Sequence, residues 1–96
     1  MKTYLMLDIS TGHFSCKDVE LLENPSELSF TCVAYNEGFI INLSMFESKL
    51  LQVEQERKRF SPEFFIIVEA ALKEGCTHIN FDRDGEEYEE FQKFEW

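Results

Sequence analysis

The stretch LSFTCVAYNEGFIINL, residues 28–43, contains two strand-like runs separated by a short polar loop. Residues 28–35 and 39–43 are rich in apolar, β-branched and aromatic side chains, which favour extended backbone. The loop Asn36-Glu37-Gly38 joins them, and its glycine can adopt the positive φ that tight hairpin turns often need. The stretch therefore predicts an antiparallel β-hairpin in the middle of the chain.

A strand and a helix are predicted before this hairpin. Residues 3–9 form a nearly continuous apolar run, which is typical of a central strand. Ser15 is placed as a helix N-cap, and Asp18, three residues later, as the acid of a capping box. Asn24-Pro25 ends this helix, because the residue before a proline disfavours helical backbone.

Two helices and a strand are predicted after the hairpin. Ser44 and Glu47 form a second capping box, which opens an additional helix. Ser61 is placed as the N-cap of the next helix, and Gly75 ends it. Residues 77–81 then form the last strand.

The order strand, helix, strand, strand, helix, strand is the βαββαβ pattern of ferredoxin-like folds. We therefore predict an α+β, two-layer sandwich with a four-stranded, mainly antiparallel sheet and the Ser44 helix as an insertion. In that topology the first and last strands are antiparallel neighbours, which sends Asp8 and Asp82 to opposite ends of the sheet. If these strands are parallel instead, one edge of the sheet collects Asp8, Ser10, Thr11, His13, Asp82 and Asp84.

The composition is that of one domain over residues 1–96. The chain is 44% hydrophobic and 15% aromatic, and its ten phenylalanines can fill a core without disulfides or metal, so no cofactor is expected. Three cysteines and the lack of a signal-peptide core near Met1 predict reduced thiols and a cytoplasmic location. No apolar stretch approaches the roughly 20 residues of a membrane helix, so no membrane contact is expected.

The charge balance limits the kinds of partner. Nine Lys and Arg residues stand against 19 Asp and Glu residues, for a net charge of −10. Phosphate contacts require cations, so this balance argues against direct nucleic-acid binding. The expected partner is a basic protein.

Half of the net charge lies in residues 82–96, which we call the acidic C-terminal segment. It holds seven acids and two cations, interleaved with aromatic residues. We predict a partner-binding surface formed by Asp82, Asp84, Glu86, Glu87, Tyr88, Glu89, Glu90, Phe91, Phe94 and Trp96. In the alternative interpretation the acids are a solvated rim and the aromatics pack onto the sheet; homodimerisation through an exposed edge strand is a further alternative.

Two chemical alternatives compete with this non-enzymatic interpretation. Asp8, Asp82 and Asp84, with Ser10 or Thr11, offer oxygen ligands for a divalent metal in hydrolysis or phosphoryl transfer. The chain has no glycine-rich phosphate loop, however, and acids that merely end strands explain the pattern equally. We therefore assign no catalytic residue.

The second alternative is a small zinc-stabilised domain. The zinc ligands would be His13, Cys16, Cys76 and His78. Their spacing differs from that of common zinc fingers, and buried cysteines with a solvated histidine explain the same residues without a metal.

Three segments resemble a known family: Leu7-Asp8-Ile9-Ser10-Thr11-Gly12-His13, then Gly75-Cys76 with Ile79-Asn80-Phe81-Asp82-Arg83-Asp84, and Phe94-Glu95-Trp96. They are similar to small uncharacterised bacterial proteins, a domain of unknown function carried on plasmids and other mobile elements. The resemblance spans nearly the whole chain and implies a setting but no activity. In that setting, a small acidic protein could inhibit a basic host protein by mimicking nucleic-acid charge.

Overall fold

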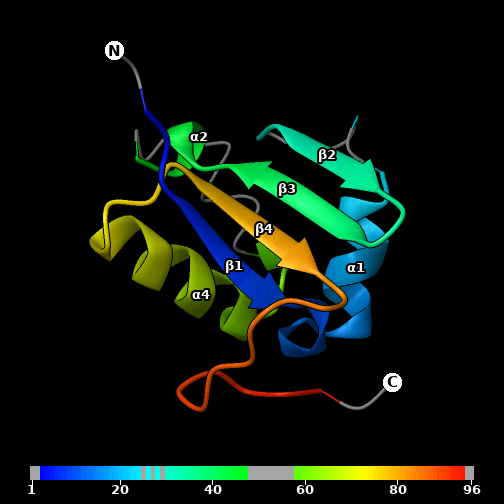
Figure 1. Ribbon diagram of the computed structural model, residues 1–96. Coiled ribbons are helices and arrows are strands. Elements are labelled where there is room, and N and C mark those ends of the chain that lie inside the picture. Colours follow the sequence, from blue (N-terminus) through cyan, green and yellow to red (C-terminus); the bar gives the residue numbers. More distant parts are fainter. Residues whose placement is uncertain (1–2, 25, 27, 29, 48–57, 95–96) are drawn as a thin grey trace.

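The computed structural model describes residues 3–24, 26, 28, 30–47 and 58–94. Four strands and four helical segments have the following bounds, with the labels of Figure 1: β1 Met6–Ser10, η1 Thr11–His13, α1 Cys16–Leu22, β2 Cys32–Tyr35, β3 Gly38–Asn42, α2 Ser44–Glu47, α4 Pro62–Lys73 and β4 His78–Asp82. The fold class is α+β, as predicted. Residues 48–57, which follow α2 in the sequence, lie outside the described residues.

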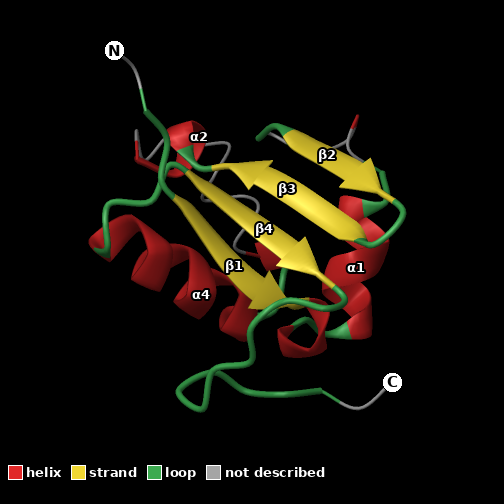
Figure 2. Ribbon diagram, viewed as in Figure 1, coloured by secondary structure: helices red, strands yellow, loops and turns green. Residues whose placement is uncertain are grey.

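The four strands form one mixed sheet in the order β1-β4-β3-β2. β2 pairs with β3 and β3 with β4 in antiparallel fashion, whereas β1 and β4 are parallel, with Met6 opposite His78 and Ser10 opposite Asp82. Helices α1 and α4 lie on the same face of the sheet, and none of the described helices covers the other face, which we call the uncovered face (Figure 2). The predicted ferredoxin-like order with antiparallel first and last strands is therefore not what the structure has.

The position of α4 explains the direction of β4. α4 finishes at the end of the sheet where β3 finishes, so β4 begins there (Figure 1). The end of β3 and the start of β4 are therefore adjacent, with the Leu43 N–H donating to the Thr77 carbonyl at 2.9 Å. β4 consequently runs antiparallel to β3 and parallel to β1.

Phenylalanine fills the layer between sheet and helices. Phe14, Phe64 and Phe81 are fully buried, and the Phe14 ring lies 6.0 Å from the Phe64 ring in a stacked arrangement. Along α4 the inward face comprises Phe64, Phe65, Ile67, Val68 and Ala71. This face agrees with the apolar stripe expected of an amphipathic helix.

The predicted caps at Ser15 and Ser61 and the predicted end of α4 at Gly75 are confirmed, with one difference in the chemistry of the first capping box. α2 begins at Ser44, whose backbone N–H donates to the Asn42 side chain at 2.9 Å, and the capping box of Ser44 with Glu47 stays a prediction. The Ser15 and Ser61 hydroxyls accept the backbone N–H groups of Asp18 and Phe64. Gly75 ends α4 with φ 83°. The Asp18 carboxylate, however, is fully buried and accepts from the backbone N–H of Ser61 at 2.8 Å and from its hydroxyl. Asp18 therefore joins the starts of α1 and α4.

The hairpin is confirmed, but Gly38 is needed for a different reason from the one predicted. Gly75 is the glycine with positive φ in the described part of the chain, so Gly38 supplies no left-handed turn. Gly38 pairs with Tyr35 on one side and with Asp82 on the other. A Cβ atom on it would lie 1.7 Å from the Phe81 carbonyl oxygen. Close approach of β3 to β4 therefore requires glycine at this position.

Candidate functional site

Residues 82–94 of the acidic C-terminal segment pass the carboxyl end of β1 and continue beside η1 (Figure 1). Two backbone hydrogen bonds fix it to the first elements of the chain. The Ser10 N–H donates to the Glu86 carbonyl at 2.8 Å, and the Phe94 N–H donates to the Gly12 carbonyl at 2.8 Å. The segment is thus ordered against the domain between Glu86 and Phe94.

His13 holds the middle of this segment. Its ring is 1% exposed, donates from Nδ1 to the Gln92 carbonyl at 2.8 Å and accepts the Tyr88 backbone N–H at Nε2 at 3.0 Å. These bonds define a neutral ring with the proton on Nδ1. The Phe91 ring lies 6.0 Å away in an edge-on arrangement. His13 is therefore a buried anchor for the segment, a role that the sequence analysis did not assign to it.

The aromatic residues of the segment face the domain. Tyr88 and Phe91 are half-buried and pack against the hydrophobic core, and the Tyr88 hydroxyl donates to the Asp8 carbonyl at 2.8 Å. Phe94 is also half-buried, and Trp96 lies outside the described residues. Tyr88 and Glu86 thus occupy part of the outer edge of β1. An edge-to-edge homodimer would use β2, the other edge strand.

The acids between Asp82 and Glu90 face solvent, with one exception. The exposed acids are Asp84, Glu86, Glu87, Glu89 and Glu90. Glu87 forms a 3.0 Å salt bridge with Lys93, whose hydrogen bond and charge lower the pKa of the Glu87 carboxyl. Such an exposed pair contributes little stability. The exposed carboxylates form an acidic outer surface on a segment anchored from beneath.

Asp82 is the exception, because its carboxylate is bonded within the domain. Oδ1 accepts the Asp84 backbone N–H and Oδ2 accepts the Tyr35 hydroxyl, each at 2.8 Å, and these bonds lower the pKa of Asp82. Burial, followed by the bond to Asp82, raises the pKa of Tyr35 to about 12. Tyr35 also contacts Asn80, whose amide donates to Asp8 at 3.4 Å. A polar row therefore crosses the uncovered face of the sheet.

The parallel pairing places Asp8, Ser10 and Asp82 at the same end of the sheet, as the enzyme alternative required. Nevertheless, in the described part of the chain no three His, Cys, Asp or Glu side chains gather in a way that could hold a metal ion. Asn80 lies opposite Asp8, and the Ser10 hydroxyl accepts the Gly12 N–H at 3.0 Å. These residues consequently give no support to a metal-activated nucleophile.

The four candidate zinc ligands are also engaged separately. Both ring nitrogens of His13 are bonded within the chain, and His78 Nδ1 lies 2.7 Å from the Thr77 hydroxyl. Cys16 is exposed beside Glu20, whereas Cys76 is buried. Burial raises the pKa of the Cys76 thiol, which disfavours the thiolate that zinc binds. The set does not fit a zinc ion.

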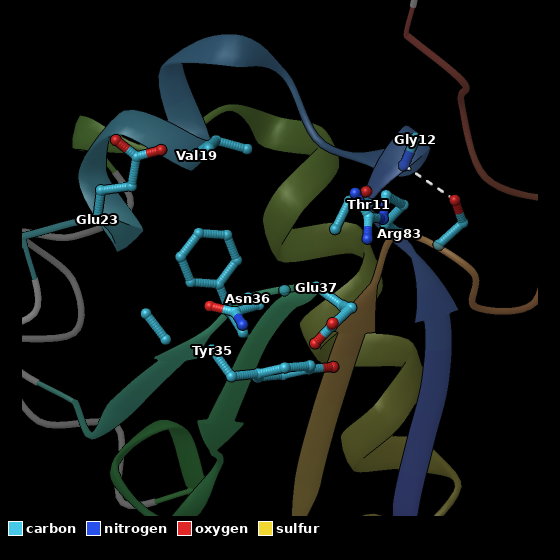
Figure 3. Close-up of a pocket in the computed structure, with 12 residues that line it drawn as sticks. Thr11, Gly12, Val19, Glu23, Tyr35, Asn36, Glu37 and Arg83 are labelled. Atoms are coloured by element: carbon cyan, nitrogen blue, oxygen red, sulfur yellow. Dashed lines mark hydrogen bonds between the residues drawn. The ribbon is translucent and has the colours of Figure 1, made fainter.

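A cavity of about 580 Å³ lies beside the segment, at the carboxyl ends of the parallel strands β1 and β4. We call it the carboxyl-end cavity. It lies between α1, the start of η1, the β2–β3 hairpin and Arg83 (Figure 3). No local signal in the sequence indicates this cavity, because its walls come from four segments that only the tertiary structure brings together.

Comparison with known proteins identifies the family. Residues 6–96 match the model for the C-terminal domain of DUF5983, a family of unknown function. The chain belongs to the DUF5983 family. The predicted resemblance to a domain of unknown function is thereby confirmed. No curated protein and no solved structure matches the chain.

The DUF5983 match covers every element described above, including residues 82–94 of the acidic C-terminal segment. The anchored segment is thus part of the matched domain. In the described residues, none of the helices has the length and apolar character needed to cross a membrane.

Proposed function

We propose that this DUF5983 domain is a protein-interaction module that presents its acidic C-terminal segment to a basic protein. The observation that carries the proposal is the division of the segment into two faces. Tyr88 and Phe91 pack inward and contact His13, and five acids are exposed on the outer side. A loose tail would lose conformational entropy on binding, whereas an anchored segment has already lost it.

This arrangement changes the expected role of the aromatic residues. Tyr88 and Phe91 hold the segment in place, so they are unavailable as anchors that enter a partner's pocket. Affinity and association rate would come mainly from charge, with net charge −10 steering a basic partner toward the surface. Binding is therefore expected to weaken strongly with salt.

The nucleic-acid-binding groove of another protein is a suitable basic surface for such a module. Duplex DNA carries closely spaced phosphate charges, and the segment presents five exposed carboxylates within seven residues, from Asp84 to Glu90. A protein that binds phosphates through Lys and Arg could bind these carboxylates in their place. We propose inhibition by charge mimicry as the consequence, in a cell where the chain meets a basic host protein.

The test is capture of partners from a bacterial lysate with two charge variants of equal net charge. The first replaces Asp84, Glu86, Glu87, Glu89 and Glu90 by the corresponding amides. The matched control replaces five acids of the two long helices and their caps: Glu20, Glu23, Glu63, Glu69 and Glu74. Each variant removes five negative charges, and Asp82 is kept because it is bonded to Tyr35.

We expect the wild type and the matched control to retain the same basic protein at low salt. The segment variant should lose it, and added duplex DNA should displace it from the wild type. Equal retention by the two variants would contradict a role for the segment. Displacement by salt but not by DNA would support an acidic docking surface and contradict the mimicry of nucleic acid.

A further inference from the structure

The carboxyl-end cavity has the position of a ligand site. β1 and β4 are parallel neighbours, so the chain leaves both strands at the same end of the sheet. After β1 it turns into η1 and α1, and after β4 it enters the acidic C-terminal segment. In open sheets, ligands bind where chains diverge from the carboxyl ends of adjacent strands. A volume of about 580 Å³ lies within the range of small-molecule sites.

The walls combine apolar surface with charges of both signs. Val19 and Glu23 project from α1 on one side, and Thr11 and Arg83 lie on the opposite side (Figure 3). The hairpin turn contributes Glu37 between them, and the remaining apolar lining includes Ala34 and Phe39. The cavity therefore offers two carboxylates and one guanidinium around an apolar body.

Arg83 is the cation of this cavity. Its side chain is exposed, and within the described part of the chain no carboxylate forms a salt bridge with it. Its backbone N–H donates to the Glu37 carbonyl at 2.8 Å, which ties the end of β4 to the hairpin turn. The positions of Arg83 and Glu37 at the cavity are thereby fixed relative to each other.

The balance of charges selects the ligand. Two carboxylates and one guanidinium are complemented by two cationic groups and one anionic group. A purely anionic ligand would be repelled by a chain of net charge −10. Free arginine and lysine carry an α-ammonium group, a side-chain cation and a carboxylate, joined by a methylene chain that suits apolar walls.

We propose that the carboxyl-end cavity binds a free basic amino acid. The ligand carboxylate pairs with Arg83, one cationic group pairs with Glu37, and the other pairs with Glu23. The methylene chain lies against Val19. Arg83 belongs to the acidic C-terminal segment, but neither it nor Glu23 or Glu37 is among the five acids of the proposed partner surface, so the two proposals can be tested separately.

The test is isothermal titration of the whole chain with L-arginine and L-lysine, and with three reference compounds. Agmatine lacks the carboxylate, Nα-acetyl-arginine lacks the α-ammonium group, and L-glutamate lacks the side-chain cation. We expect saturable binding of arginine or lysine, with each reference compound at least about tenfold weaker, the size of one lost charged hydrogen bond. Nuclear magnetic resonance should place the shifted amides at Gly12, Glu37 and Arg83.

Two variants and two matched controls locate the site. Arg83→Gln should weaken arginine about tenfold and leave agmatine unchanged, and Glu37→Gln should weaken both. Lys73→Gln and Glu74→Gln make the same charge changes at the end of α4, outside this cavity, and should leave binding within about twofold. All four side chains are exposed, so the fold should persist.

Three results would overturn the proposal. The first is no saturable heat with either arginine or lysine. The second is agmatine binding as tightly as arginine, which would show that Arg83 does not pair with the ligand carboxylate. The third is equal weakening by Glu37→Gln and Glu74→Gln, which would show attraction to the overall charge instead of a site.

Discussion

Replacing His13 by alanine is expected to release the acidic C-terminal segment while the sheet stays folded. The substitution removes the Nδ1 bond to Gln92 and the Nε2 bond from Tyr88. It also removes a ring that lies 6.0 Å from Phe91 and 6.4 Å from Tyr88. Two hydrogen bonds at about 0.5–1.5 kcal/mol each and the ring contacts at about 0.5–1.5 kcal/mol together give about 1.5–4.5 kcal/mol.

This free energy belongs to the opening of the segment, which is a local event. Amide hydrogen exchange measures such opening residue by residue. The best reporter is the Phe94 amide, whose bond to the Gly12 carbonyl is left intact by the substitution. Its protection should fall about 10- to 1,600-fold, because each 1.4 kcal/mol is about a factor of ten. The Ile79 amide in the centre of the sheet should change much less.

His78→Ala is the matched control, because His78 is the other histidine of the chain and lies at the start of β4, whereas the acidic C-terminal segment follows the end of β4. It should leave the protection of the Phe94 amide unchanged. Unaltered protection of Phe94 in His13→Ala would refute the anchoring role of His13. An equal loss at Phe94 and Ile79 would also refute it, because the segment would then open only with the whole domain.

Three further predictions concern the domain itself. Asp18→Ala should lower the free energy of unfolding by about 2–4 kcal/mol, since the Ser61 N–H and hydroxyl lose a buried acceptor; an unchanged urea midpoint would contradict this. Gly38→Ala should lower the free energy of unfolding by at least about 2 kcal/mol, because its Cβ clashes with the Phe81 carbonyl. Gly75→Ala places its Cβ more than 4 Å from any atom of a non-neighbouring residue and should lower the free energy of unfolding by only about 1–2 kcal/mol, because of its positive φ. Equal urea midpoints of the two variants would contradict the close approach at Gly38. The pKa of Tyr35 is raised to about 12 from 10.0, so the folded state holds the proton more tightly and stability should fall as pH rises through this range. Asp82→Asn should lower the Tyr35 pKa in an ultraviolet tyrosinate titration, and an unchanged titration would mean that burial alone raises it.

The sequence predicted the elements well where the signals are local. Ser15 and Ser61 cap their helices, and Gly75 ends α4, because each interaction lies within a few residues of the chain. The hairpin loop was also visible. The reason for Gly38 was not, because the Phe81 carbonyl that excludes a side chain is more than forty residues away.

The candidate site was located in part. Composition alone singled out the acidic C-terminal segment, since charge density is readable without coordinates. The sequence allows the division into inward aromatics and outward acids only as an alternative interpretation. His13 was considered as a zinc ligand or a solvated turn residue, and no local signal indicates that its ring meets Tyr88 and Gln92 across more than seventy residues.

By itself, the sequence determined the fold class, most helix and strand positions, and the negative charge of the surface, because each depends on local pattern or on composition. Only the tertiary structure decided the direction of β4, which depends on the end of the sheet at which α4 finishes. That direction makes β1 and β4 parallel, brings Ser10 opposite Asp82 and opens the carboxyl-end cavity. Long-range pairing is a property of the whole packed chain, so no short segment encodes it.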